Sequence, residues 1–269
     1  MDCKILLEEA LFSSNIQLKR DHLEKFQYNC IKNTPSLNYI PKRLTTPSYS
    51  DICKIVPLKE LPKRRNFANK DELIALVHSI AHIEYSAIDL AIDAVYRFFF
   101  MPNEYKKDWI EVALDEIRHF LLLQELLFEL DSYYGALEVH SSLFEMAKKT
   151  SDSVLERMAV IPRFYEAVGL DVNPKIVDKL KSYKKNKIIL KLIDALNIIY
   201  KEEIEHVKKG DKWFKYLCLK ENLSPIDTYF DIIRKYNLHL KGKFINIEGR
   251  KEAGFSCKEL IKIGANSCD

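Results

Sequence analysis

The sequence has few glycines and no paired-cysteine motif. Seven glycines among 269 residues disfavour folds that are rich in tight turns, and they disfavour a glycine-rich phosphate-binding loop. The six cysteines include no Cys-x-x-Cys pair, so a zinc-ribbon spacing is absent and nothing indicates a disulfide framework. We therefore expect reduced cysteines and a cytoplasmic location.

The sequence also lacks a long apolar run and an excess of charge of one sign. No stretch of about eighteen apolar residues occurs, and the N-terminus has no basic-then-apolar signal pattern, so we expect no membrane association. The 42 basic and 39 acidic residues give a net charge of +3, which requires neither nucleic acid nor an anionic surface as a partner. The basic runs at 63–65 and 181–187 are predicted to be solvated, and RNA binding is not favoured.

Five of the nine prolines lie between residues 31 and 69, where they exclude a long helix. We expect one amphipathic helix over 4–28, and then an ordered arm held by apolar side chains. The tail beyond Asn237 is predicted to be irregular. The predicted organisation is an N-terminal helix and arm over 1–70, a helical bundle over 71–222, and a C-terminal helix and tail over 223–269.

The helical period holds for about 150 residues from Asp71 onward. Four long helices are expected: 71–100, which Asn69 or Asp71 would cap, 104–134, one from after His140 to Gly169 with a bend at Pro162, and 187–220. A short helix is predicted to start at Asn173 and Pro174, and another follows Ser224. Four long helices with modest connections predict an all-α four-helix bundle with additional N- and C-terminal helices and an extended N-terminal arm.

A carboxylate and an imidazole lie on an apolar helix face in the stretch DEIRHFLLL. Residues three or four apart share a helix face, so Glu116 and His119 lie together among apolar side chains such as Trp109 and Leu123. Burial of an ionised carboxylate is costly without a partner. The stretch KEEIEHV repeats the pattern with Glu203 and His206, and two such pairs favour metal binding over chance.

The other two long helices each contribute one more acid. Glu84 lies on an apolar face, and Glu166 shares its face with Arg163, so that a simple Arg163–Glu166 ion pair is the alternative for this position. Four helices that offer Glu, Glu-x-x-His, Glu and Glu-x-x-His match the ligand set of a carboxylate-bridged dinuclear site. Oxygen and imidazole ligands suit two iron ions, with manganese or a mixed manganese–iron pair as alternatives. The predicted ligands are Glu84, Glu116, His119, Glu166, Glu203 and His206.

These motifs, in the order HSIAHIEYSAIDLA, DEIRHFLLL, YGALEVHSSLFEMA, IPRFYEAVGLDVNP, EEIEHVKKGDKWFKYLC and RKEAGFS, resemble a bacterial ferritin-like family of unknown function. The resemblance covers about residues 61–256. More distantly, the PRxxEA-type stretch is similar to the di-iron hydroxylase that modifies isopentenyl-adenosine in tRNA. The resemblance implies a ferritin-like fold and the same six ligands, but it implies no reaction.

The residues beside the ligands predict a supporting shell. Metal-bound histidines usually donate their second ring N–H to a carboxylate, so we expect crossed pairs, Asp115 with His206 and Glu202 with His119. Arg118 is expected to pair with one of these acids, and Arg163 is placed in the same shell. The alternative is that Asp115 pairs with Arg118 or His119 on its own helix.

Three further histidines are candidates for other roles. His78 and His82 are assigned to a substrate pocket or, as the alternative, to hydrogen bonding on their helix. His140 is expected to cap or pack a helix start.

The function that these residues predict is dioxygen activation for the oxidation or hydroxylation of a small molecule, with an electron-donor protein as partner and the chain as a monomer or dimer. The alternative is a non-catalytic metal-binding or ferroxidase-like protein. We expect the arm and the tail to fold over the bundle and to restrict access to the site.

Overall fold

The structure, a computed structural model, describes residues 2–31, 39–61, 66–239 and 244–268. Every regular element in these ranges is a helix, and the β features there are limited to one isolated parallel bridge between Ile55 and Val139. The all-α class is therefore confirmed. The predicted arm residues Pro35 and Pro62, the basic run at 63–65 and Gly242 lie outside the described ranges.

The chain divides into two compact units. The first contains Met1–Lys148 and Lys185–Ala195, and the second contains Lys149–Lys184 and Leu196–Asp269. These boundaries differ from the predicted division at residues 70 and 222. Helix α8 (Lys187–Lys220) contributes its first turns to the first unit and the remainder to the second.

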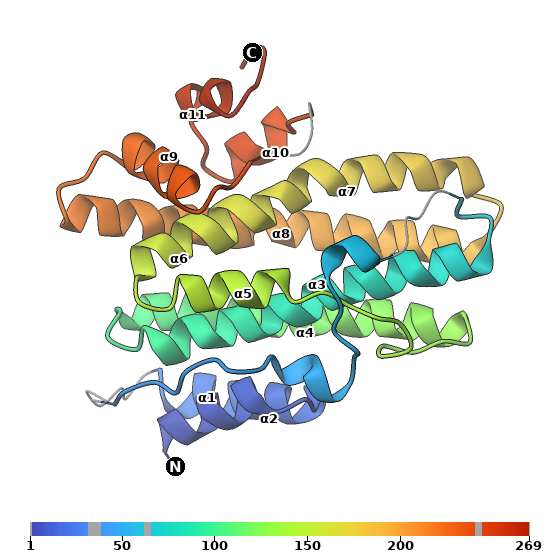
Figure 1. Cartoon of the computed structure of the whole chain (residues 1–269), viewed down its shortest axis with the longest axis horizontal. Coiled ribbons are helices and arrows are strands. Elements are labelled where there is room, and N and C mark those ends of the chain that lie inside the picture. Colours follow the sequence, from blue (N-terminus) through green and yellow to red (C-terminus); the bar gives the residue numbers. More distant parts are fainter. Residues whose placement is uncertain (1, 32–38, 62–65, 240–243, 269) are drawn as a thin grey trace. The chain divides into compact units, whose positions relative to one another are not determined.

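The centre of the first unit is the pair of helices α3 (Lys70–Arg97) and α4 (Asn103–Glu129), which pack along one another (Figure 1). The predicted cap at Asn69 is confirmed, because its side chain accepts a hydrogen bond from the backbone N–H of Glu72 at 3.1 Å. The predicted end of the second long helix near residue 134 is wrong. Helix α4 ends at Glu129, and Asp131 has a positive φ of 56°.

The single N-terminal helix predicted over 4–28 is also wrong. Two helices, α1 (Cys3–Phe12) and α2 (Ile16–Asn29), pack together on α3 and α4. The break has a local cause, because the Asn15 side chain accepts a hydrogen bond from the backbone N–H of Leu18 at 3.0 Å and so caps α2. Helical periodicity continues through this break, which is why the pattern hides it.

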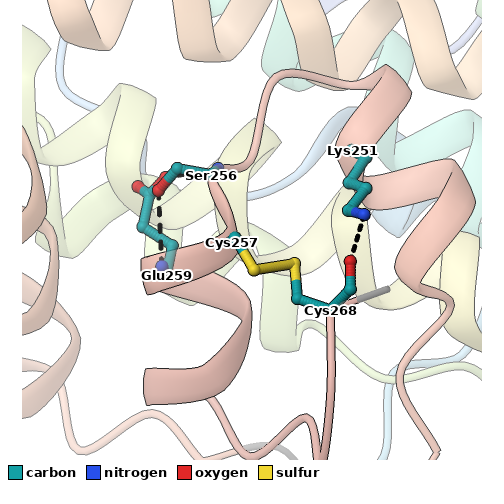
Figure 2. The surroundings of a disulfide bond; sticks show 5 residues. All are labelled: Lys251, Ser256, Cys257, Glu259 and Cys268. Atoms are coloured by element: carbon teal, nitrogen blue, oxygen red, sulfur yellow. Dashed lines mark hydrogen bonds between the residues drawn. A yellow bond between two sulfur atoms is a disulfide. The ribbon is translucent and has the colours of Figure 1, made fainter.

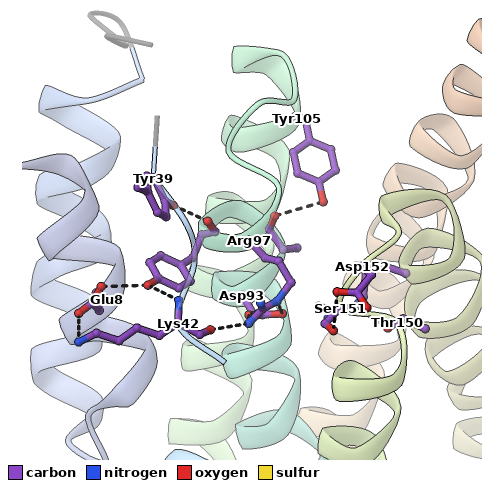
Figure 3. A network of polar contacts seen from close by, with 12 residues as sticks. Glu8, Tyr39, Lys42, Asp93, Arg97, Tyr105, Thr150, Ser151 and Asp152 are labelled. Carbon is purple, nitrogen blue, oxygen red and sulfur yellow. Dashed lines mark hydrogen bonds and ion pairs between the residues drawn. The ribbon is translucent and has the colours of Figure 1, made fainter. Parts of the chain in front are cut away.

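The arm is ordered over residues 39–61 and includes two short turns, η1 (Ser48–Asp51) and η2 (Leu58–Glu60). Figure 3 shows its start: the Tyr39 hydroxyl donates to the carbonyl of Tyr96, and Arg97 holds Asp93 and the carbonyl of Lys42. The predicted ordered arm is thus confirmed for these residues.

A buried lysine fixes the next part of the arm. Lys19 is fully buried, and its Nζ donates to Asp89 Oδ1 at 2.6 Å and to the carbonyl of Ala10 at 2.8 Å. The Ser48 hydroxyl donates to Asp89 Oδ2 at 2.7 Å. One carboxylate on α3 therefore anchors both α2 and the arm. The first unit also contains most of α5 (Ser142–Lys149).

The second unit differs most from the prediction. The helix predicted from 141 to 169 is interrupted after α5, and Ser153 caps a new helix, α6 (Val154–Val160). A π-helix, η3 (Ile161–Glu166), follows and leads directly into α7 (Ala167–Leu180). The predicted helix end at Gly169 and the predicted start at Asn173–Pro174 are therefore wrong.

Helix α7 continues through Pro174 because a distant residue compensates for the missing N–H. A proline leaves the carbonyl four residues earlier without its helical donor. That carbonyl belongs to Leu170, and it accepts a hydrogen bond from Asn246 Nδ2 at 3.0 Å.

The second unit then continues through η4 (Lys181–Tyr183), α8, α9 (Pro225–Lys235), α10 (Ile247–Glu252) and α11 (Cys257–Lys262). The tail is thus partly helical, where an irregular course was predicted. The start of α9 after Ser224 is confirmed, because the Ser224 side chain accepts from the backbone N–H of Asp227.

Two disulfides, Cys3–Cys30 and Cys257–Cys268, contradict the expectation of reduced cysteines. Spacing alone does not indicate them, because the first joins the start of α1 to the residue after α2. Cys53 and Cys218 are free and buried. The cytoplasmic location stays a prediction. In the described residues α3 alone is long and apolar enough to cross a membrane, yet 72% of its most apolar window is buried, which is typical of a core helix.

Candidate metal centre

Three of the predicted ligands come together in the first unit. Helix α3 provides Glu84, and α4 provides Glu116 and His119, with ligand atoms that all lie within 4.8 Å of one another. His119 Nδ1 is 3.2 Å from Glu116 Oε2 and 3.3 Å from Glu84 Oε2. Glu116 and His119 are 0% exposed and Glu84 is 5% exposed, so the apolar faces identified in the sequence are buried faces.

One imidazole nitrogen faces both carboxylates of this cluster. His119 Nδ1 hydrogen-bonds to Glu116, and Glu84 Oε2 is left buried without a hydrogen bond. Such an atom is costly to bury. Two carboxylates, one of them with an oxygen that lacks a hydrogen bond, and an imidazole form a donor set that suits a divalent cation. The residues present are therefore able to bind a metal ion.

The electrostatics of the cluster support the same conclusion. Burial, and then the charge of Glu116, raise the pKa of Glu84 to about 7. Burial alone would lower the pKa of His119, but the hydrogen bond to Glu116 and the nearby carboxylates of Glu116 and Glu84 raise it to about 11. Without a metal ion, a proton on His119 compensates the carboxylates, and a cation at this position would take over that role.

The second Glu-x-x-His pair lies on α8 in the second unit. His206 is 0% exposed, and its Nδ1 is 3.7 Å from Glu203 Oε1. The spacing of three residues therefore brings imidazole and carboxylate together, as it does on α4. On the same helix Glu205 is exposed and forms an ion pair with Lys208 at 3.1 Å.

Glu166 is the last residue of the π-helix η3. Single π-helical turns occur frequently at functional sites, because the extra residue redirects side chains. The alternative Arg163–Glu166 pair is not what the structure shows: Arg163 donates to Asp211 Oδ1 at 2.7 Å and to Glu259 Oε1 at 2.6 Å. Residues three apart share a face in an α-helix, but the wider π turn separates them.

Two of the predicted supporting residues pair on their own helix. Arg118 binds Asp115 Oδ1 at 3.0 Å, and both side chains are partly exposed. This contact meets the expectation that Arg118 pairs with one of the two acids, and it is also the same-helix pair of the alternative. The crossed pairs, Asp115 with His206 and Glu202 with His119, stay a prediction.

His78 and His82 hold the loop after α4. Gly135 donates its backbone N–H to His78 Nε2 at 3.0 Å. His82 Nε2 donates to the carbonyl of His140 at 2.7 Å, so its Nδ1 accepts from the hydroxyl of Tyr134 at 3.0 Å. Burial lowers the pKa of His82 to about 4, which keeps it neutral. These bonds agree with the alternative, a hydrogen-bonding role for both histidines, and the substrate pocket stays a prediction.

His140 acts at the start of α5, as expected. Its Nδ1 accepts a hydrogen bond from the backbone N–H of Ser142 at 3.2 Å.

Sequence patterns did not identify the residues that surround η3. Gly210 is the only glycine in α8, and a Cβ at this position would lie 2.3 Å from Pro162 Cβ. An isolated glycine in a long helix usually has a packing reason, so this signal was present. Glu259 had a local signal of another kind, because Ser256 and Glu259 form the Ser-x-x-Glu pattern of a capping box, but that pattern does not indicate Arg163; Asp211 had no comparable local signal.

Comparison with known proteins places the chain in a family. A model of the family described as "Protein of unknown function (DUF455)" matches residues 9–261, which include all six predicted ligands. A Haemophilus influenzae protein described as "Uncharacterized protein" is 37% identical over 213 residues, which is 77% of this chain and 72% of that protein. No solved structure matches the chain.

Proposed function

We propose that this chain, which belongs to the DUF455 family, is a dinuclear metal-carboxylate protein with a ferritin-like bundle that oxidises or hydroxylates a small molecule with dioxygen. Two divalent ions, iron in the first place and manganese or a mixed pair otherwise, would be held by six residues. These are Glu84, Glu116, His119, Glu166, Glu203 and His206.

The observation that carries the proposal is the buried cluster of Glu84, Glu116 and His119, whose ligand atoms lie within 4.8 Å. The buried Glu84 oxygen without a hydrogen bond lies beside a second buried carboxylate, and such an arrangement is costly unless positive charge compensates it. A cation supplies that compensation. Structural ion pairs also perturb buried acids, and metal analysis of variants distinguishes the two explanations.

The pair Glu203–His206 on α8 extends the proposal from one ion to two. Its spacing repeats that of Glu116 and His119, and His206 is buried like His119, while the Glu203 side chain is 14% exposed. With Glu84 and Glu166, four carboxylates balance the four positive charges of two divalent ions. When bound, two redox-active ions would supply the chemistry by which dioxygen oxidises a substrate.

The residues of the chain itself would fix geometry and exclude water. Buried imidazoles keep one orientation when the nitrogen remote from the metal donates to a carboxylate. We assign this role to Asp115 for His206 and to Glu202 for His119. In this arrangement Arg118, which is 3.0 Å from Asp115, holds the acid in place.

Metal analysis of matched variants tests the site. The purified chain, loaded without oxygen with iron(II) or manganese(II) and then desalted, should retain two ions per chain. Glu203→Ala should lose at least one ion, and Glu205→Ala, two residues away and exposed, should lose none. Wild-type protein that retains no metal above background contradicts the proposal.

Oxygen uptake then separates the two functions. An oxidase or hydroxylase continues to consume oxygen when a reductant is supplied in excess. A ferroxidase-like protein stops after its iron(II) is oxidised, and it releases or mineralises iron(III). The second result would keep the metal site and remove the oxygenase assignment.

A further inference from the structure

A buried arginine lies in the π-helix that carries the proposed ligand Glu166. Arg163 is 0% exposed and donates to two carboxylates, Asp211 on α8 and Glu259 on α11. Its guanidinium lies over three aromatic rings, with centroid distances of 4.9 Å to Phe214, 4.4 Å to Tyr229 and 4.6 Å to Phe255.

The C-terminal segment supplies one side of this arrangement. Figure 2 shows Glu259 turned back to Ser256 at the start of α11, where Glu259 Oε2 accepts from the Ser256 backbone N–H at 2.8 Å and from its hydroxyl at 2.7 Å. The other oxygen, Oε1, accepts from Arg163. The Glu259 carboxylate thus accepts hydrogen bonds through both oxygens, from Ser256 at the start of α11 through one and from Arg163 in the π-helix through the other.

The rest of the RKEAGFS stretch joins the same packing. Arg250 forms two hydrogen bonds with Asp171 on α7, at 2.9 and 2.6 Å. Gly254 has a φ of 102°, and a Cβ on it would lie 2.4 Å from Asp211 Oδ2. At Gly254 the tail therefore lies so close to Asp211, a partner of Arg163, that only a residue without a side chain fits there.

The π-helix itself also receives an outside hydrogen bond. The hydroxyl of Tyr229 on α9 donates to the carbonyl of Arg163 at 3.2 Å. π turns are rare in proteins, and this outside hydrogen bond stabilises the one in this chain. The contacts to α8, α9 and α11 all converge on Arg163, three residues before Glu166.

We propose that Arg163 is a positioning residue for the metal ligand Glu166, and that Glu259 and Asp211 hold Arg163 in place. The C-terminal segment from Asn246 to Glu259 is then part of the support of the metal centre. This inference rests on the proposed function, because it requires Glu166 to bind a metal ion. In this role Arg163 fixes the π turn, and the π turn sets the direction of the Glu166 side chain.

The test measures manganese(II) binding to the full-length, metal-free chain by titration and by competition with a chelator. Loss of an outer residue typically weakens metal affinity about 10- to 100-fold. We expect this loss for one of two ions in Glu259→Gln, which removes the charge that faces Arg163. Glu166→Ala identifies the affected ion, and the same ion should be weakened in both variants.

Ser256→Ala is the matched control. It removes the hydroxyl that caps α11 and that donates to Glu259 Oε2. The backbone N–H of Ser256 still donates to Oε2 and Arg163 still donates to Oε1, so this variant should have a lower melting temperature with unchanged metal affinity. Arg163→Lys, which keeps the charge but cannot bind two carboxylates in a fixed fork, replaces Glu259→Gln if that variant does not fold.

The outcomes separate this inference from the proposed function. If wild-type protein binds no ion, the proposed function fails. If wild-type protein binds two ions and both Glu259→Gln and Arg163→Lys bind them equally well, Arg163 does not position Glu166. If the affinity for both ions falls equally in Glu259→Gln and in Ser256→Ala, the inference is also overturned, because that result indicates a general loss of stability.

Discussion

The close approach of α8 to the π-helix predicts that the same substitution affects stability differently at two glycines. Gly210 lies in α8 against Pro162, and Gly169 lies near the start of α7, where a Cβ would have no atom within 4 Å. Both are helical, so glycine-to-alanine substitution should stabilise each helix by about 1 kcal/mol when nothing else changes. We expect this gain at Gly169 and not at Gly210.

The magnitude at Gly210 follows from the distance. A new Cβ would lie 2.3 Å from Pro162 Cβ, whereas carbon atoms in contact are about 3.5–4.0 Å apart, so the two helices must separate by about 1.2–1.7 Å. The proline ring cannot rotate away. Overpacking of this kind costs about 1–3 kcal/mol, which offsets the helical gain, and Gly210→Ala should range from neutral to about 2 kcal/mol less stable.

Thermal unfolding of the metal-free proteins measures the difference. In a chain of this size, 1 kcal/mol corresponds to roughly 2–4 °C, so Gly169→Ala should melt a few degrees above Gly210→Ala. The displaced π turn should also reduce metal retention in Gly210→Ala, whereas Gly169→Ala should retain two ions. If Gly210→Ala is as stabilising as Gly169→Ala and retains both ions, the reasoning about η3 is refuted.

Three further predictions concern protons and the disulfide. The pKa of His82 is about 4 in the folded protein and about 6.5 in the unfolded chain, so between these pH values the unfolded chain binds more protons. The free energy of unfolding should therefore fall by about 3 kcal/mol as the pH drops from 7 to 4. Denaturant unfolding should show a smaller dependence of stability on pH for His82→Gln and an unchanged dependence for the exposed His239→Gln. Removal of the Cys3–Cys30 disulfide, with a sequence separation of 27, should lower stability by about 3–4 kcal/mol, and the difference from wild type should disappear in reductant. Metal binding should release the proton that the raised pKa keeps on His119, so affinity should rise with pH; calorimetry in buffers of different ionisation enthalpy would contradict this if no proton is released.

The helices that could be predicted are those fixed by local signals. The start of α3 at Asn69 and the start of α9 after Ser224 follow from cap residues beside an apolar period. Breaks could not be predicted where periodicity continues through them, as at Asn15. The rule that a proline ends a helix fails at Pro174. The carbonyl of Leu170, which the proline leaves without a helical donor, accepts a hydrogen bond from Asn246, 72 residues after Pro174.

The candidate ligands could be found for the same reason. Glu116 and His119, like Glu203 and His206, are three residues apart on one helix, so their proximity is a property of the helix and needs no knowledge of tertiary structure. The proximity of Glu84 to His119 depends on the packing of α3 against α4, and the sequence could only suggest it through the total ligand inventory.

The support of Glu166 could not be predicted from local patterns. In the sequence, Arg163 and Glu166 share a face only if the segment is α-helical, and the π turn removes that premise. The partners that Arg163 finds instead lie 48 and 96 residues away. A buried arginine without those carboxylates would be strongly unfavourable, so the π turn and the folded tail depend on one another. We therefore expect the geometry around Glu166 to respond to changes in the tail, although no local pattern connects the two.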